Sequence, residues 1–291
     1  MTNQYYGKLF YALSRDGYNW TLLNNKQFID PAYIGHPDIC QGRDGAYYML
    51  AVQPFALWRS VDLIHWEKTP LDEQILNKSS QIGYYTTYYL GAPKMFYDKT
   101  SDQYMITWHA CTNPVADDWP SMRTFYVLTS DFSNFTFPKK LFDFTGEASN
   151  MCTIDNIIKK VGDTYYAFYK DEREPEVAPQ TGKTIRFSTS KSLTGPYTNP
   201  IGSLTSNDNN REAPIVVERP EGKGWFLYAE CCLGFPLGYS IYSSDNIYGP
   251  YKEGILHAPD ITDGTERPLA RHGAIVKIPE SIYQGLLNTK F

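Results

Sequence analysis

Several short apolar runs in the sequence begin with a polar side chain that could take part in chemistry. Asp155 and Glu212 each stand at the start of such a run, and so do His36, Lys94 and the pair 271–272, which is Arg-His. Two carboxylates can act as proton donor and proton acceptor when their surroundings keep one of them protonated. An imidazole, an ammonium and a guanidinium beside them would bind a polar ligand. The residue types therefore indicate acid–base chemistry, provided that the chain brings these starts together.

The segments that carry these residues have the pattern of β-hairpins. The run 153–159 ends at a Gly-Asp turn, and a second strand follows at once over 164–169. Tight turns of Gly and Asp between β-branched and aromatic runs predict β-hairpins. Three other runs show the same module, whereas the last, over 271–277, has no hairpin partner after it. We expect the five first strands to surround one pocket and their leading residues to face it.

A second signature recurs along the chain: a strand that ends in Ser, then a polar turn, then an aromatic residue. Its copies begin at Ser14, Ser60, Ser130, Ser190 and Ser243. Repeats of this length that are built from four short strands predict a β-propeller. Four units are complete, over 36–66, 91–137, 153–197 and 211–251. The fifth is split between an inner strand over 271–278 and outer strands over 5–20, so that the two chain ends close the ring.

The sequence thus predicts an all-β fold, a five-bladed β-propeller that forms a single domain over residues 1–291. Its 42% hydrophobic and 20% charged residues are typical of a globular protein. Aromatic residues make up 15% of the chain and include 24 Tyr. Such a surplus fits a β-rich core, and it also fits stacking against the flat faces of sugar rings.

The charge pattern and the cysteines limit the partners. The net charge is −5 and no basic stripe is visible, so nucleic acid is not an expected partner. No apolar run is long enough to span a membrane, and the first residues lack a signal-peptide core. The five cysteines have no metal-type spacing and read as reduced thiols. We expect a cytoplasmic protein, or a secreted one if a leader was removed; the oligomeric state is left open.

The order and spacing of six motifs carry a family resemblance over nearly the whole chain. The motifs lie at 11–20, 39–45, 60–66, 154–172, 192–197 and 271–273. With them, the chain resembles the five-bladed propeller glycosidases of glycoside hydrolase family 43, which include arabinofuranosidases and xylosidases. The resemblance implies three carboxylates at an axial funnel: a general base, an Asp that orients the acid and tunes its pKa, and a Glu that acts as general acid.

By position, Asp155 matches the orienting Asp and Glu212 matches the acid. The base departs from the pattern, because His36 stands where the family has Asp. Asp38 lies two residues on and shares a strand face with it. Three alternatives stay open: His36 is the base, Asp38 activates the water while His36 binds a sugar hydroxyl, or the site has lost hydrolysis.

Other positions are expected to bind substrate. Arg271 and His272 match the fifth inner strand of the family, where the His is a substrate contact, a ligand of an axial Ca or Na ion, or a structural residue. Lys94 replaces a Glu of the relatives and would favour an anionic sugar. Aromatic and imidazole rings near the funnel are expected as contacts at Phe55, Trp108 and His109. No cofactor is expected to be required.

The expected function is an exo-acting, inverting glycosidase that cleaves an oligosaccharide. Inversion places the acid and the base roughly 6.5–9.5 Å apart, with a water between the base and the sugar. Repulsion from Asp155 would keep Glu212 protonated. The rivals are a carbohydrate-binding propeller without turnover, and a non-hydrolytic sugar-active enzyme in which His36 abstracts a proton.

Overall fold

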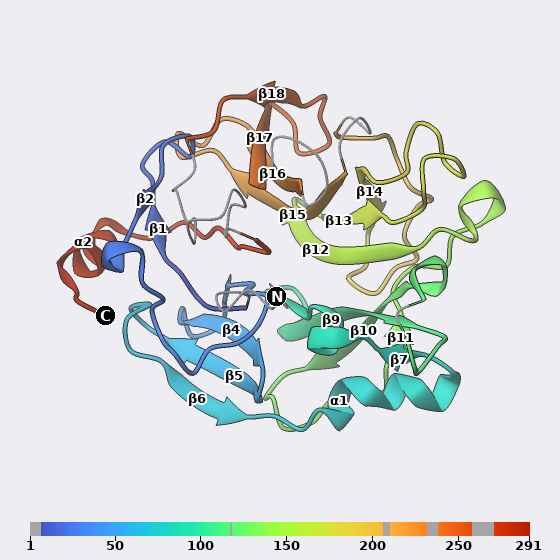
Figure 1. Ribbon diagram of the computed structural model, residues 1–291, viewed down its shortest axis with the longest axis horizontal. Helices are drawn as coiled ribbons and strands as arrows, with labels where there is room; N and C mark the ends of the chain where they lie inside the picture. Colours follow the sequence, from blue (N-terminus) through green and yellow to red (C-terminus); the bar gives the residue numbers. More distant parts are fainter. Residues whose placement is uncertain (1–6, 117, 206–209, 232–237, 258–270) are drawn as a thin grey trace. The chain divides into compact units, whose positions relative to one another are not determined.

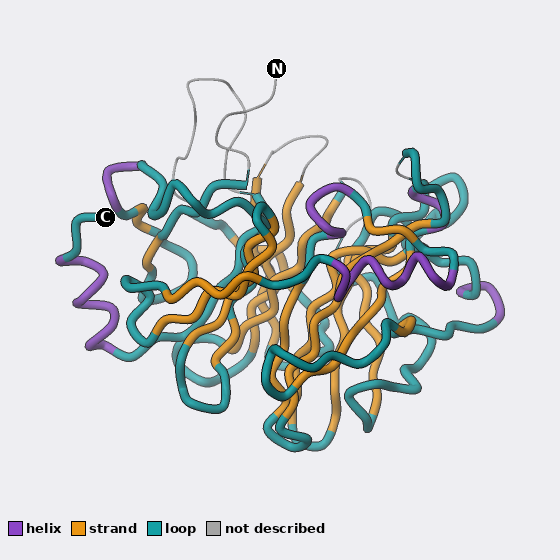
Figure 2. Tube along the Cα trace, turned by 90° about the horizontal axis from the view of Figure 1, so that it is seen from below, coloured by secondary structure: helices purple, strands orange, loops and turns teal. Residues whose placement is uncertain are grey.

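The computed structural model describes residues 7–116, 118–205, 210–231, 238–257 and 271–291. Strands form most of its regular structure, and the helices are short (Figure 2). The chain divides into two compact units, one of residues 1–70 with 215–291 and the other of residues 71–214. In Figure 1 the colours follow the sequence from the N-terminus to the C-terminus, and most of the strands are labelled. Among the described residues, no helix is long and apolar enough to cross a membrane.

The unit of residues 71–214 holds two antiparallel sheets. The first has the order β11-β10-β9-β7, and β8 also pairs with β9; the second has the order β12-β13-β14. The strands of the first are β7 (Tyr85–Thr86), β8 (Lys94–Asp98), β9 (Gln103–Cys111), β10 (Arg123–Thr129) and β11 (Lys139–Lys140). Those of the second are β12 (Thr153–Val161), β13 (Thr164–Asp171) and β14 (Ile185–Ser190). Short helices fill the connections, namely α1 (Gln74–Asn77), η2 (Lys78–Ile82), η3 (Tyr88–Gly91), η4 (Trp119–Ser121) and η5 (Gly146–Ala148).

The other unit holds two four-stranded sheets and a ribbon. The sheets run β3-β4-β5-β6 and β15-β16-β17-β18, and the ribbon is β1-β2. The strands are β1 (Ala12–Leu13), β2 (Thr21–Leu22), β3 (Cys40–Gln41), β4 (Tyr47–Val52), β5 (Phe55–Ser60), β6 (Glu67–Pro70), β15 (Arg211–Glu218), β16 (Trp225–Cys231), β17 (Gly238–Ser244) and β18 (Lys252–Gly254). The helices are η1 (Asn24–Lys26) and α2 (Glu280–Asn288). The first residues of β15, up to Pro214, belong to the unit of residues 71–214.

The recurring Ser motif is a side-chain-capped turn. The Ser60 hydroxyl accepts the backbone N–H of Leu63 at 2.8 Å, and Asp62 accepts those of Ile64 and His65 at 2.9 and 2.8 Å. Such local hydrogen bonds let Ser and Asp replace the ladder where a strand ends. In the third and fifth copies the organising hydroxyls are those of Thr129 and Ser244, so the predicted Ser130 and Ser243 are each one residue out of register.

Strands that are buried along most of their length build separate cores. In the unit of residues 71–214 one core joins β9, β10, β12 and β13 around buried Met105, Met151, Ala167 and Tyr169. In the other unit, separate cores surround Tyr33, Met49 and Trp58, and surround Phe226, Tyr228 and Ile241. The described cysteines, Cys40, Cys111, Cys152 and Cys231, are free thiols, as predicted.

Four of the predicted repeats coincide with sheets of three or more strands, but the prediction of a closed fifth blade needs correction. Within the described ranges, residues 271–278 contain no assigned strand, and the N-terminal segment contributes only the β1–β2 ribbon. Instead, Val276 and Ile278 pack against a core that contains Leu13 and Leu23. Side-chain burial thus holds the C-terminal segment without a hydrogen-bonded ladder. Residues 5 and 6 of the predicted outer strands lie outside the described residues, and the single-domain assignment stays a prediction.

Candidate active site

Asp155 lies at an irregularity in β12. The register of β12 against β13 shifts between Ile154 and Ile157, and Asp155 has a φ of 53°. A β-bulge re-aims the side chain that it carries, and Asp tolerates the left-handed region better than most residues. The carboxylate is buried, and its Oδ2 accepts the backbone N–H of Ala213 at 3.1 Å. Ala213 also has a positive φ, of 47°. Two strained positions therefore face each other across a buried hydrogen bond.

Glu212 immediately precedes the residue that Asp155 holds. It lies in β15 and is 7% exposed. Its Oε2 accepts a hydrogen bond from Nζ of Lys170 at 2.9 Å. The sequence prediction that Asp155 and Glu212 are neighbours agrees with this geometry, although the chemical roles assigned to them stay predictions.

Lys170 was not predicted as a site residue. It lies near the end of β13, is 2% exposed, and also contacts Glu172 with its Nζ 2.7 Å from Oε2. Lys183 contacts the other oxygen of Glu172 at 2.7 Å. Burial would lower the pKa of Lys170, but the charges of Glu212 and Glu172 raise that pKa well above its usual value. The buried ammonium therefore stays charged between two carboxylates.

This cation changes the expected proton balance of the site. A charged ammonium next to Glu212 favours the ionised carboxylate, whereas repulsion from Asp155 would favour the protonated one. A signal for Lys170 was present in the sequence: Lys170 and Glu172 follow an aromatic strand at i and i+2 and so share one face. Their partner across the site could not be deduced from that spacing.

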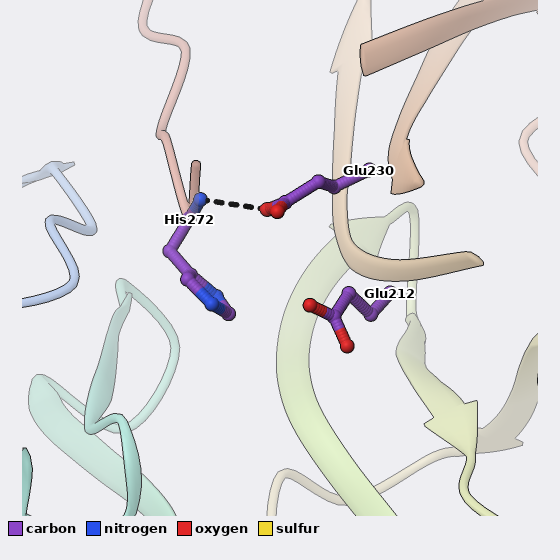
Figure 3. Close-up of side chains that lie close together, drawn as sticks. All are labelled: Glu212, Glu230 and His272. Atoms are coloured by element: carbon purple, nitrogen blue, oxygen red, sulfur yellow. Dashed lines mark hydrogen bonds between the residues drawn. The ribbon is translucent and has the colours of Figure 1, made fainter. Parts of the chain in front are cut away.

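In the other unit, two predicted site residues that are far apart in the sequence, His36 and His272, lie in contact. The imidazole rings of His36 and His272 stack with centroids 4.0 Å apart and planes 7° apart, and both residues are 8% exposed. Glu230, in β16, accepts the backbone N–H of His272 at 2.9 Å (Figure 3) and forms an ion pair with Arg271. Glu230 is 1% exposed and was missed, although a carboxylate inside the apolar run 225–231 was a visible signal. An axial Ca or Na ion at His272 stays a prediction.

The remaining predicted residues take different environments. Lys94, Trp108 and His109 lie in β8 and β9 and are 5%, 2% and 8% exposed. Phe55 opens β5 and is 2% exposed, whereas Asp38 is half-buried. The Phe55 and Trp108 rings thus have the burial of core side chains, which leaves little ring surface for a sugar. Their role as substrate contacts stays a prediction.

Two cavities lie in the unit of residues 1–70 and 215–291. One, of about 260 Å³, is lined by residues that include Trp20, Phe226 and Tyr283. The other, of about 140 Å³, is mostly apolar and is lined by residues that include Leu13 and Leu286. Neither is lined by a residue that the sequence predicts for the site.

Solved structures with the same fold are glycoside hydrolases of low identity. A GH43_12 protein retrieved from a capybara gut metagenome is 18% identical, with a TM-score of 0.57 over 84% of this chain and 46% of that one. For the exo-β-1,3-galactanase of Phanerochaete chrysosporium, crystallised with β-1,3-galactotriose, the values are 14%, 0.55, 82% and 53%. For the α-L-arabinofuranosidase of Lactobacillus brevis they are 14%, 0.55, 79% and 75%. These similarities confirm the all-β propeller fold.

The sequence comparisons give the family. An α-L-arabinofuranosidase of Bifidobacterium longum subsp. longum is 30% identical over 155 residues, which are 49% of this chain and 14% of that protein. The chain therefore spans only a small part of this curated relative and about half of several structural ones. The family model for the domain related to glycoside hydrolase family 43, described as "Probable glycosyl hydrolase domain", matches residues 45–284. Because the match covers most of the sequence, the chain belongs to this family of glycosyl hydrolase domains.

Proposed function

We propose that the protein is a glycosidase that removes sugars from an end of an oligosaccharide, with inversion of the anomeric configuration. The observation that carries this proposal is the hydrogen bond from the Ala213 N–H to Asp155, which ties this buried carboxylate to the residue that follows the buried Glu212. Family membership supports hydrolysis, and the exo-acting galactanases among the structural neighbours support attack at a chain end.

In the proposed reaction, Glu212 donates a proton to the glycosidic oxygen as the C–O bond breaks. A water molecule attacks the anomeric carbon from the opposite face and gives its proton to a base, for which His36 and Asp38 are the candidates. The pair of Asp155 and Lys170 sets when Glu212 carries a proton, because the two groups act on it with opposite sign. The bond from the anomeric carbon to the glycosidic oxygen is replaced by a bond from the anomeric carbon to the water oxygen, and no oxidant or cofactor is consumed.

The test is an activity screen on neutral and acidic oligosaccharides, followed by NMR of the first product formed. Release of single sugar units whose anomeric configuration is opposite to that of the substrate supports the proposal. Retained configuration would contradict inversion, and early formation of mid-length fragments would contradict exo attack. Release of an unsaturated sugar would instead support the non-hydrolytic enzyme based on His36.

A carbohydrate-binding protein without turnover is the second candidate. The Lys170–Glu212 ion pair favours it, because an acid must be protonated to act and a neighbouring ammonium opposes that. Calorimetry with the sugars of the same panel separates the two. Binding without release of any product over long incubation supports the binding protein, and turnover of a bound sugar excludes it.

A further inference from the structure

Lys94 is a buried lysine that has no carboxylate partner among the described residues. It is the first residue of β8 and is 5% exposed. Among the described parts of the chain, its ammonium forms no hydrogen bond and no ion pair within 4.0 Å. Lys170, a comparably buried lysine of the same unit, contacts two carboxylates. Among the described residues, Lys94 thus lacks the two carboxylate partners that Lys170 has.

The surroundings of Lys94 are polar but neutral. Thr107 lies opposite Lys94 in the β8–β9 ladder, so the two side chains share one face of the sheet. The buried Thr107 hydroxyl donates to the backbone oxygen of Asn156 at 3.3 Å, and the Asn156 amide nitrogen donates back at 3.5 Å. The side-chain oxygen of Asn156 is buried and, within the described ranges, has no hydrogen-bond partner. Thr107 therefore lies between Lys94, its partner in the ladder, and Asn156, whose side-chain oxygen has no partner among the described residues.

The same face leads to the candidate acid. Asn156 follows Asp155 in the bulge of β12, and β12 packs against both β8 and β9. Asp155 in turn holds the N–H of Ala213, next to Glu212. Lys94 is therefore connected to the candidate carboxylates through Thr107 and the bulge, all within the unit of residues 71–214.

Buried charges in proteins are normally paired, and the mostly buried Lys94 side chain has no such pair among the described residues. An arriving anion would supply the missing pair, whereas a neutral sugar hydroxyl would not. We propose that Lys94 binds an anionic substituent of the sugar, a carboxylate or a sulfate group, and that the ligand of this site is an acidic oligosaccharide. The Asn156 oxygen would accept a hydroxyl of the same sugar. This inference rests on the proposed function only in taking a sugar as the ligand.

The experiment compares wild type with Lys94→Met and Lys94→Gln in calorimetric binding to three oligosaccharides of one backbone: neutral, uronate-bearing and sulfate-bearing. Charge-assisted hydrogen bonds correspond to about 10- to 100-fold in affinity. We expect a loss of that size for one or both acidic sugars in the variants, and less than about twofold for the neutral sugar by the same reasoning. The uronate and sulfate arms distinguish the two anions.

A structural role for Lys94 would give a different result. Removing an unpaired buried charge should leave the unliganded melting temperature unchanged or raise it. The inference is overturned if both variants melt lower without ligand and bind neutral and acidic sugars equally poorly. It is also overturned if wild type shows no preference for an acidic sugar.

Turnover measured on the same panel separates this inference from the proposed function. Hydrolysis that is indifferent to substrate charge and to Lys94 overturns the inference and leaves the glycosidase intact. Binding of acidic sugars that depends on Lys94, without any turnover, supports the inference and removes the glycosidase.

Discussion

Replacing Lys170 with Met should remove the cation that neutralises two buried carboxylates. In the native protein its ammonium lies 2.9 Å from Glu212 and 2.7 Å from Glu172, whose side chains are 10% and 8% exposed. Met keeps most of the apolar volume, so packing should change little. Glu172 keeps its contact with Lys183, whereas Glu212 loses its salt bridge with Lys170.

The size of the effect follows from burial. Removing one partner of a buried ion pair typically costs 3–5 kcal/mol, and the remaining Glu172–Lys183 contact places this variant near the lower end, about 3 kcal/mol. With an unfolding entropy of roughly 2.1 cal/mol/K per residue, a loss of that size lowers the melting temperature by about 5 °C. The exposed pair of Lys191 and Asp163 is the matched control, and Lys191→Met should cause no measurable change.

The contribution of Lys170 to the free energy of unfolding should depend on pH. The native pKa of Lys170 is raised, so its contribution is complete below the ordinary lysine value of about 10.4 and is lost only at higher pH. In Lys170→Met the two carboxylates lose the Lys170 charge and are destabilised as anions, so the deficit should be largest at neutral pH and should narrow as acid protonates them. Urea unfolding between about pH 4 and 8 measures this. A deficit that is constant with pH, or no deficit at all, would refute the electrostatic explanation.

Two smaller predictions concern single carboxylates. Asp155→Ala should lower the free energy of unfolding by about 1–3 kcal/mol, because the buried Ala213 N–H loses its acceptor. Asp155→Asn keeps an acceptor and tolerates the positive φ, so it should lose less. Equal losses for the two variants in urea unfolding would argue against the hydrogen bond. Burial would raise the pKa of Asp98, but hydrogen bonds from Ser101 and Tyr165 lower it overall, so its contribution is present above about pH 3.9 and lost as pH falls further. Asp98→Asn should therefore flatten the acid limb of the stability curve, and an unchanged limb would exclude this role.

Local sequence patterns predicted the sheets because each sheet forms mostly from strands that follow one another in the sequence. The Gly-Asp turn after β12 and the hydroxyl-capped turn at Ser60 need only neighbouring residues to form. Their phase also placed Asp155 and Glu212 at corresponding strand starts. The prediction for residues 271–278 was wrong, because their apolar run fits a strand but Val276 and Ile278 pack against a core that contains Leu13 and Leu23, without an assigned ladder.

The electrostatics of the site could not be predicted from spacing. Lys170 and Glu212 are 42 residues apart, and nothing local in either segment specifies that they meet. The bulge at Asp155 likewise depends on which strand its carboxylate has to reach, Ala213 being 58 residues away. Long-range pairing thus determined that Lys170 meets Glu212 and that Asp155 meets Ala213.

A matched pair of variants tests whether Glu212 is the proton donor of a hydrolytic site. Glu212→Gln and Glu172→Gln each remove a buried carboxylate that contacts the same lysine. Single-turnover sugar release, on an oligosaccharide that wild type hydrolyses, should fall about 10²- to 10⁴-fold in Glu212→Gln, the range of general acid catalysis, with binding retained. Glu172→Gln should stay within about tenfold of wild type by the same measure. Equal rates in the two variants, or full activity in Glu212→Gln, would exclude Glu212 as the proton donor.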